Sequence, residues 1–359
     1  MNTVMEERRV STRRYKEDIM SESKSILEQI KKHDLSKTAI FSGAGVDPDG
    51  LASAEVMRQI VERNGGKATV FYKGSFNRPQ NKTMRQALNL TLKSLEDFED
   101  DGFTCLVSVD GPSGVCPAKP HFIIDHHQQN EPASVANDVR PIGSCSAIMW
   151  QYAMEEGIDF ITEEGAKLAT ALSIGIMTDT QTGANDAASD LDYEALAFCM
   201  KHKDNKLYRE ILNYPQPRYY NDLYAIGWEN RTEEQAVLVT GLGDLPAGRS
   251  GAVFDLAEKY QRTDGVSTTV TFAMVDGNIM ASARSSNSSL NVDEFVKTIF
   301  GTGGGKRGAG AAFVELPPLF KDLPPEIRDQ LAKAIGQAIT HKALQIAGDG
   351  VREKATDGS

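Results

Sequence analysis

The sequence predicts an α/β fold arranged in two domains. Short apolar runs alternate with amphipathic segments through the first half of the chain, a pattern typical of strands and helices that build a mainly parallel sheet. The length of 359 residues exceeds the ~100–200 residues of one typical domain. Apolar patterning also resumes after a stretch rich in turn formers, between about 190 and 235. We therefore expect a parallel-sheet domain followed by a smaller α/β domain.

The expected elements of the first domain follow in order. Short apolar runs predict four buried strands, at 38–43, 67–72, 103–110 and 121–125. Amphipathic segments predict helices at 51–64, 82–95, 144–157 and 163–180. Gly65 and Gly66 end the first of these helices, and Ser144 is the expected N-cap of the third.

The second half continues the alternation of strands and helices. We expect strands at 235–242 and 267–285, the latter a hairpin that turns at Asp276-Gly277, and helices at 250–261, 292–300 and 324–347. A glycine-rich loop at 301–310 leads into another strand. The predicted division is a charged helical extension (1–36), a first domain (37–190), a connector (191–235) and a second domain (236–350).

Composition excludes some classes of function. The chain carries 39 basic and 50 acidic residues, a net charge of −11, whereas proteins that grip long nucleic acid need a basic surface. The charged N-terminal segment has no apolar signal core, and no run approaches the ~20 apolar residues of a membrane span. The four cysteines form no metal-binding pair pattern. We expect a cytoplasmic protein with reduced thiols that binds neither long nucleic acid nor membranes.

Acidic and imidazole side chains follow three of the four strands predicted in the first domain. They are Asp47, Asp49, Asp110, Asp125, His126 and His127. Because the carboxyl ends of parallel strands share one edge of a sheet, these groups should face one crevice, and Asp179 in a Thr-Asp-Thr turn adds a further carboxylate. Converging carboxylates would repel one another without a cation. Oxygen and imidazole ligands suit Mn²⁺, Fe²⁺ or Mg²⁺.

Each of these motifs also has a plainer interpretation. The segments around Asp47 and Asp110 contain Pro and Gly and would most often be turns, and Asp179 alone would be a helix cap. The tandem histidines could belong to a satisfied polar cluster. The joint occurrence of all four motifs at predicted element ends favours a metal site.

The segment "IIDHHQ" (123–128) resembles the signature of the DHH phosphoesterase superfamily. "VDPDGLASA" (46–54), "LVSVD" (106–110) and "GIMTDT" (175–180) resemble its other motifs, in the family's order. "ASARSS" (281–286), followed by "FGTGGGKRGAGA" (300–311), resembles the type-1 DHH-associated domain. The resemblance spans about 38–316. It implies an N-terminal DHH domain and a smaller C-terminal α/β domain that binds substrate.

The resemblance implies roles for individual residues. The implied metal ligands are Asp47, Asp49, Asp110, His126 and Asp179. Asp110 matches the carboxylate that bridges two Mn²⁺ ions. His127 matches a histidine beside the scissile phosphate, and Asp125 matches an acid that orients the histidines, so the implied catalytic set is His126, His127 and Asp125. The implied substrate-binding residues are Arg284, Ser285, Gly303, Gly304, Gly305, Lys306 and Arg307.

The sequence departs from the family pattern at two positions. Gly43 stands where family members that cleave dinucleotides usually have a histidine ligand, so two ions, one ion or weakened metal binding all stay open. Lys306 stands where the glycine loop usually has a histidine. Lysine still suits a phosphate, but as a point charge with different donor geometry.

The function that the resemblance implies is Mn²⁺-dependent hydrolysis of short linear nucleotides to mononucleotides, with dinucleotides such as pGpG or pApA, or nanoRNA, as substrates. Two enzyme alternatives are a cyclic-dinucleotide phosphodiesterase and a phosphatase of 3′-phosphoadenosine 5′-phosphate. A third alternative is a nucleotide-binding regulator with an impaired metal site. The resemblance is compatible with a homodimer, which no heptad or apolar stripe in the sequence decides.

Overall fold

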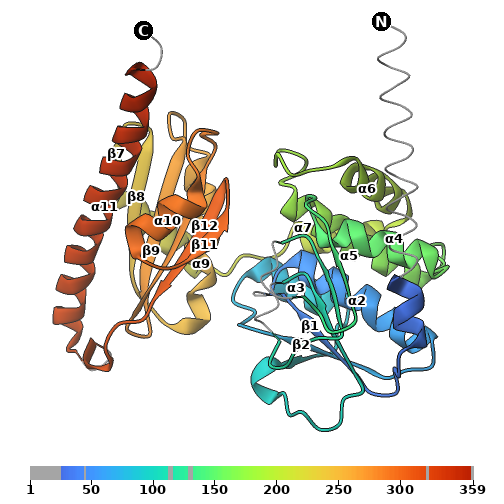
Figure 1. The fold of residues 1–359 in the computed structure, drawn as a ribbon. Coiled ribbons are helices and arrows are strands. Elements are labelled where there is room, and N and C mark those ends of the chain that lie inside the picture. Colours follow the sequence, from blue (N-terminus) through green and yellow to red (C-terminus); the bar gives the residue numbers. More distant parts are fainter. Residues whose placement is uncertain (1–25, 44–45, 112–115, 128–131, 321–322, 357–359) are drawn as a thin grey trace, which may run out of the picture. The chain divides into compact units, whose positions relative to one another are not determined.

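The computed structural model describes residues 26–43, 46–111, 116–127, 132–320 and 323–356 (Figure 1). The chain divides into two compact units. Unit 1 comprises residues 1–76 and 80–214, and unit 2 comprises 77–79 and 215–359. Most of the predicted N-terminal extension (1–36) lies outside the described residues, but 26–32 are helical, and Ile26, Leu27 and Ile30 are buried in the core of unit 1.

Unit 1 is built on a six-stranded sheet in which all neighbouring strands are parallel, in the order β3-β2-β1-β4-β5-β6. Its strands are β1 (Thr38–Ser42), β2 (Ala68–Tyr72), β3 (Leu92–Ser94), β4 (Cys105–Val109), β5 (Phe122–Asp125) and β6 (Ala136–Val139). The strand order reverses at β1, since β2 pairs on one side of it and β4 on the other. In sheets of this kind, functional groups gather beyond the carboxyl ends of the strands near such a reversal.

Both faces of this sheet are covered by apolar side chains. The helices of unit 1 are α2 (Pro48–Arg63), α3 (Pro79–Ala87), α4 (Cys145–Glu155), α5 (Glu163–Asp179), α6 (Asp190–His202) and α7 (Asn205–Leu212). Helices α2, α4 and α5 share one large core with the strands, in which Met57, Tyr152 and Leu172 are buried. A smaller cluster around Phe41 and Phe71 covers the other face. Burial on both faces explains why β1, β4 and β5 are apolar throughout rather than alternating.

The structure corrects two details of the predicted unit 1. The helix predicted at 82–95 ends at Ala87, because Asn89 adopts a left-handed conformation (φ 54°) and the chain then enters the short strand β3. The strand β6 was missed because its sequence, "ANDV", is polar, as an edge strand with exposed positions allows. The predicted N-cap of α4 is confirmed, since the Ser144 side chain accepts a hydrogen bond from Ala147 N.

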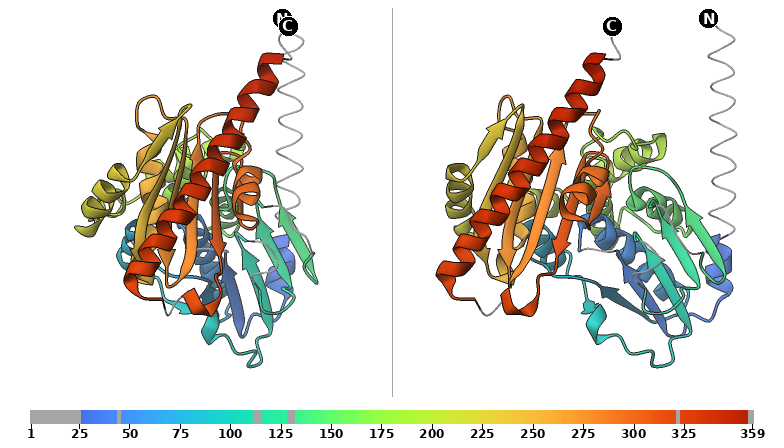
Figure 2. Two further views of the ribbon diagram at one scale, coloured as in Figure 1. Left: turned by 90° about the vertical axis from the view of Figure 1, so that its left-hand side faces the viewer. Right: turned by 60° about the vertical axis from the view of Figure 1, so that its left-hand side comes forward.

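Unit 2 contains a mixed six-stranded sheet in the order β11-β12-β10-β9-β8-β7 (Figure 2). Its strands are β7 (Thr232–Glu234), β8 (Val237–Leu245), β9 (Thr268–Val275), β10 (Asn278–Ser285), β11 (Gly304–Lys306) and β12 (Ala309–Val314). Only β8 and β9 run parallel, and the other pairs are antiparallel. The predicted β9–β10 hairpin is confirmed: both Asp276 and Gly277 have positive φ, which suits a two-residue turn.

Helices cover both faces of the second sheet. They are α8 (Tyr219–Glu229), α9 (Gly251–Gln261), α10 (Val292–Phe300) and α11 (Pro325–Thr356). One apolar cluster joins α8 and α9 to the sheet, and another joins α10 and α11 to the opposite face, where α11 lies across β8 (Figure 2). Of the three helices within the predicted connector (191–235), α6 and α7 belong to unit 1, whereas α8 belongs to unit 2. In the described part of the chain, no helix is both long and apolar enough to cross a membrane.

Candidate metal centre

The first two predicted ligands lie at the start of α2, directly beyond β1. Asp47 is the N-cap of α2, and its side chain accepts a hydrogen bond of 2.8 Å from Gly50 N. Asp49 is fully buried in the first turn, and its two carboxylate oxygens accept hydrogen bonds from Cys145 N (2.8 Å) and Ser146 N (2.7 Å). Asp49 therefore binds the N-terminus of α4, where exposed N–H groups favour a negative charge.

Asp110 follows the last residue of β4 and is buried. Its backbone is left-handed (φ 53°), an uncommon conformation for a residue other than glycine, and its N–H donates to Ile124 O of β5. A Cβ at Gly50 would lie 2.8 Å from Ser42 Oγ and 3.1 Å from Asp110 Oδ2. The absence of a side chain at Gly50 thus lets α2 approach the end of β4 closely enough to bring the two motifs together.

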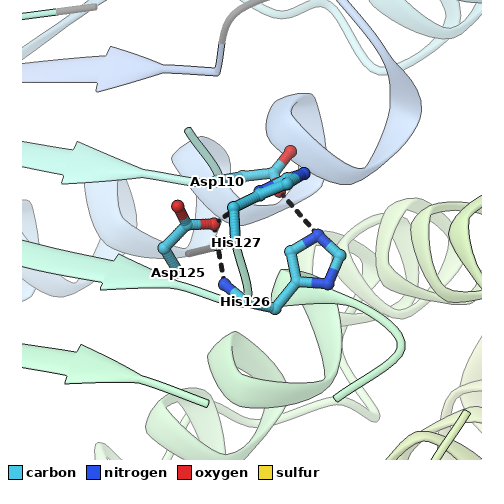
Figure 3. A group of neighbouring side chains, drawn as sticks. All are labelled: Asp110, Asp125, His126 and His127. Atoms are coloured by element: carbon cyan, nitrogen blue, oxygen red, sulfur yellow. Dashed lines mark hydrogen bonds and ion pairs between the residues drawn. The ribbon is translucent and has the colours of Figure 1, made fainter. Parts of the chain in front are cut away.

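The tandem histidines follow β5, whose last residue is Asp125 (Figure 3). Asp125 is fully buried, and its Oδ1 accepts hydrogen bonds from His126 N (2.7 Å) and from Nδ1 of His127 (2.9 Å). His126 uses its own Nδ1 differently, because it lies 3.0 Å from the carbonyl oxygen of Ile142. An N–H at Nδ1 satisfies that carbonyl, so the other ring nitrogen, Nε2, carries the lone pair in the neutral ring.

The Nε2 atom of His126 points into a group of carboxylates. It lies 3.1 Å from Asp179 Oδ2, 3.4 Å from Asp110 Oδ1 and 3.9 Å from Asp49 Oδ2. Both Nε2 and Asp110 Oδ1 are buried, and neither makes a hydrogen bond of acceptable geometry with the residues that the structure describes. A buried lone pair that faces buried carboxylate oxygens is unfavourable unless a proton or a cation lies between them.

The charges of the cluster perturb one another strongly. Burial, together with the neighbouring carboxylates Asp49 and Asp47, raises the pKa of Asp110 well above its usual range. Burial and the charge of Asp179 likewise raise the pKa of Asp49 to about 6. Burial opposes charging of His126, but the close carboxylates of Asp110 and Asp179 outweigh it and raise that pKa to about 11. The cluster as folded therefore favours added positive charge.

The donor set fits a divalent cation. Two overlapping groups each place one ligand atom per residue within 4.8 Å of the others: Asp110, Asp125, His126 and His127 form one, and Asp49, His126 and Asp179 form the other. Carboxylate oxygens with one or two imidazoles suit Mn²⁺, Mg²⁺ or Fe²⁺ rather than a thiolate-bound metal. His126 belongs to both groups, so such an ion would be held by His126 with Asp110 in the first group or with Asp49 and Asp179 in the second.

Two other predicted positions, Asp47 and Gly43, are not part of the two groups of ligand atoms. Asp47 is close enough for its charge to raise the pKa of both Asp49 and Asp110, but it belongs to neither group of converging ligand atoms. Gly43 has a φ of 45° and donates its N–H to Val109 O. It adds no side-chain ligand, so the described residues leave the number of ions open.

The predicted substrate residues lie in unit 2. Arg284 at the end of β10 is largely buried, and one of its nitrogens lies 3.1 Å from Glu258 Oε1, an atom that Arg78 also approaches to 3.1 Å. Ser285 is buried too, and its hydroxyl shares a hydrogen bond of 2.8 Å with Thr268. Arg284 is thus a fixed, acid-paired guanidinium rather than a mobile surface charge.

The predicted glycine loop is a short hairpin. Gly304, Gly305 and Lys306 form strand β11, which pairs with β12, while Gly303 has a φ of 103°. The Gly305 N–H donates to Asp293 Oδ1 (2.9 Å), and Arg307 donates to Ser288 O. The amide of Gly305 is therefore engaged within the protein. A Cβ at Gly305 would lie 2.1 Å from Ala309 O, so glycine at this position also has a packing reason.

Sequence reasoning missed the groups that orient the ligands through their backbone. The Ile142 carbonyl fixes the ring of His126, and the N–H groups of Cys145 and Ser146 fix Asp49. The expected N-cap at Ser144 was the available signal, because it places a helix N-terminus, and hence unpaired N–H groups, at the residues that follow.

The comparisons with known proteins agree with this fold. No protein-family model matches the sequence. The chain is 30% identical over 334 residues to the uncharacterised protein MJ1633 of Methanocaldococcus jannaschii, which covers 91% of this chain and 68% of that protein. It is also similar to the crystal structure of an exopolyphosphatase-related protein from Bacteroides fragilis, with a TM-score of 0.63 and 14% identity over 88% of this chain and 97% of that chain.

A crystal structure of RecJ from Thermus thermophilus in complex with Mn²⁺ is similar at a lower TM-score of 0.45, with 13% identity, covering 90% of this chain and 55% of that chain. The identity to the archaeal protein extends over nearly the whole sequence. The parallel sheet, the second mixed sheet and the four motifs at the element ends match the resemblance in the sequence. The chain therefore belongs to the same family as the M. jannaschii protein, and it shares its fold with the exopolyphosphatase-related protein, as the resemblance of its motifs to the DHH superfamily implies.

Proposed function

We propose that the protein is a metal-dependent phosphodiesterase that hydrolyses short linear nucleotides to mononucleotides. The observation that supports this most directly is the buried Nε2 of His126, which faces Asp110 and Asp179 and has no hydrogen-bond partner among the described residues. When bound there, a divalent cation such as Mn²⁺ would polarise a phosphate and lower the pKa of a water molecule.

The chain's own residues supply the remaining chemistry. Asp125 holds Nδ1 of His127 and thereby orients that ring, which is about one third exposed, toward solvent. His127 is the proposed group that holds or donates a proton beside the phosphate, and its exposure gives a ligand access. Asp110, with its raised pKa, favours the cation that would neutralise it.

Unit 2 supplies the proposed specificity. Arg284 is fixed by Glu258 and by the hydroxyl of Ser282 (2.8 Å), so it could present its guanidinium in one orientation. Lys306 and Arg307 add positive charge at the β11–β12 hairpin, because both Lys306 and Arg284 pair with Ala309 of β12. The net charge of −11 disfavours long nucleic acid, whose affinity comes largely from phosphate contacts, and favours a substrate of a few nucleotides.

A substrate panel tests this proposal. Metal-stripped protein would be incubated with pGpG, pApA, labelled RNAs of two to seven nucleotides, cyclic dinucleotides and 3′-phosphoadenosine 5′-phosphate, each with Mn²⁺, with Mg²⁺ or with chelator. We expect linear dinucleotides to be cleaved fastest, and only with metal. Faster turnover of a cyclic dinucleotide or of the bisphosphate would instead assign one of those substrates.

A metal analysis separates the enzyme from a regulator. The purified protein and the Asp110→Ala variant would be compared for bound Mn²⁺ and for cleavage of pGpG. Full Mn²⁺-dependent cleavage by the variant contradicts the proposed site. Nucleotide binding by the wild-type protein without bound metal or cleavage would favour a regulatory protein.

A further inference from the structure

One short loop contacts the proposed metal centre at two separate points. Residues 142–146 connect β6 to α4 and include the first residues of that helix. The Ile142 carbonyl accepts from Nδ1 of His126, and the N–H groups of Cys145 and Ser146 donate to Asp49. A shift of this loop would therefore move one proposed imidazole ligand and one carboxylate together.

A buried carboxylate on a different helix holds this loop. Asp192, in the first turn of α6, is only 1% exposed. Its Oδ2 accepts from Gly143 N (2.9 Å), and its Oδ1 accepts from the hydroxyl of Ser144 (2.7 Å). Its Oδ2 also accepts from the N–H (2.8 Å) and the hydroxyl (2.7 Å) of Ser189.

Helix capping explains only half of these contacts. Ser189 and Asp192 form a capping box at the start of α6, and this accounts for the hydrogen bonds between those two residues. It does not account for the bonds to Gly143 and Ser144, which are 49 and 48 residues away in sequence. Asp192 therefore joins α6 to the loop in addition to capping its own helix.

The packing at Gly143 shows that this junction is tight. A Cβ at Gly143 would lie 2.9 Å from Asp192 Oδ2 and 2.6 Å from Thr180 Cγ2. Thr180 follows Asp179, the carboxylate nearest to His126 Nε2. The loop is thus fitted between Asp192 and the end of α5, in addition to its contacts with His126 and Asp49.

We propose that Asp192 is a positioning residue of the metal centre, which holds the 142–146 loop so that His126 and Asp49 stay aimed at a bound cation. Asp192 itself does not touch the ion. This inference deepens the proposed function and rests on it. Groups that hold a ligand's second nitrogen or its carboxylate typically change metal affinity by ~10–100-fold when they are altered.

Three variants test the proposal by metal binding rather than by activity. Asp192→Asn keeps the size of the side chain but puts an amide where the carboxylate accepted N–H and O–H groups. Ser189→Ala removes the hydroxyl of the capping box and leaves Gly143 and Ser144 in place. Asp190→Asn changes an exposed acid in the same helical turn and is the matched control for charge.

The readouts are the Mn²⁺ dissociation constant from calorimetry, the visible spectrum of the Co²⁺-loaded protein and the Tm in chelator. We expect Asp192→Asn to weaken Mn²⁺ binding by ~10-fold or more and to alter the Co²⁺ spectrum, because the ring of His126 changes its orientation. Ser189→Ala should lower the Tm in chelator but leave Mn²⁺ affinity and the Co²⁺ spectrum unchanged. Asp190→Asn should change none of the three.

Two results would overturn the inference. One is wild-type Mn²⁺ affinity in folded Asp192→Asn, and the other is an equal loss in Ser189→Ala, which would reduce Asp192 to a helix cap. If Asp192→Asn does not fold, Ser144→Ala replaces it, because it removes one loop contact and leaves the carboxylate; wild-type affinity there also refutes the inference. Absence of Mn²⁺ binding by the wild-type protein would refute the proposed function itself, and so it is distinguishable from these results.

Discussion

Replacing Asp110 by asparagine should make the metal-free protein more stable while it removes metal binding. The carboxyl of Asp110 is buried beside Asp49 and Asp47, and its pKa is raised well above the usual range. Folding therefore disfavours its charge at neutral pH. Asparagine has nearly the same shape and no charge, so Asp110→Asn relieves that cost and removes a proposed cation ligand.

The magnitude of the metal effect can be worked from mass action. The raised pKa of Asp110 gives the direction for the metal-free variant, which should be at least as stable as the wild-type protein. Mn²⁺ at ~100 times its dissociation constant stabilises the wild-type protein by about 2.7 kcal/mol. For a unit of this size, that is a Tm increase of about 5–10 °C.

The assay is thermal unfolding of both proteins, with Mn²⁺ and with chelator, beside Asp97→Asn, which changes an exposed acid of unit 1 as a control. In chelator the Asp110→Asn variant should melt at or above the wild-type temperature, and Mn²⁺ should raise its Tm by less than about 2 °C. A variant that melts lower in chelator and still gains the full Mn²⁺ increment would refute the reasoning, because Asp110 would then be structural.

Three further predictions follow from the same site. Gly50→Ala should weaken Mn²⁺ binding by ~10-fold or more in calorimetry, since its Cβ would lie 3.1 Å from Asp110 Oδ2; unchanged affinity would contradict the close approach. His127→Ala should reduce turnover of pGpG by ~100-fold and leave Mn²⁺ affinity within ~3-fold, because its Nδ1 is held by Asp125; a lost Mn²⁺ signal would make His127 a ligand instead. The metal-free protein should lose stability as the pH rises through about 6, because the pKa of Asp49 is higher folded than unfolded, so the Tm gain from Mn²⁺ should be larger at about pH 7.5 than at about pH 5; an equal gain at both would contradict the electrostatics.

Much of the fold and part of the site could be predicted from the sequence, because one geometric rule connects them. The apolar runs at β1, β4 and β5 indicated buried parallel strands, and their carboxyl ends share an edge. That rule alone predicted that Asp110 and His126 would meet, and their atoms lie 3.4 Å apart. Asp179 was added from its position at the end of the predicted helix 163–180, which the structure places at Glu163–Asp179.

The parts that could not be predicted depend on contacts between residues far apart in sequence. The sequence shows Asp49 two residues after Asp47, but not that both of its oxygens accept from the start of α4. It shows an acid at 192, which a capping box at the start of α6 is enough to explain. The sequence therefore gives no sign that Asp192 also contacts Gly143 and Ser144. Such contacts depend on how helices pack, which hydrophobic periodicity does not specify.

The two adjacent histidines can have different roles because their Nδ1 atoms have different partners. Nδ1 of His126 donates to the Ile142 carbonyl, a neutral group, so in the neutral ring Nε2 carries the lone pair and points at the carboxylates. Nδ1 of His127 pairs with Asp125, an acid, which fixes the orientation of that partly exposed ring. Their ring centroids lie 4.2 Å apart with an angle of 71° between the ring planes, so the two rings point in different directions. The proposed role of each histidine is therefore set by the partner of its Nδ1 atom.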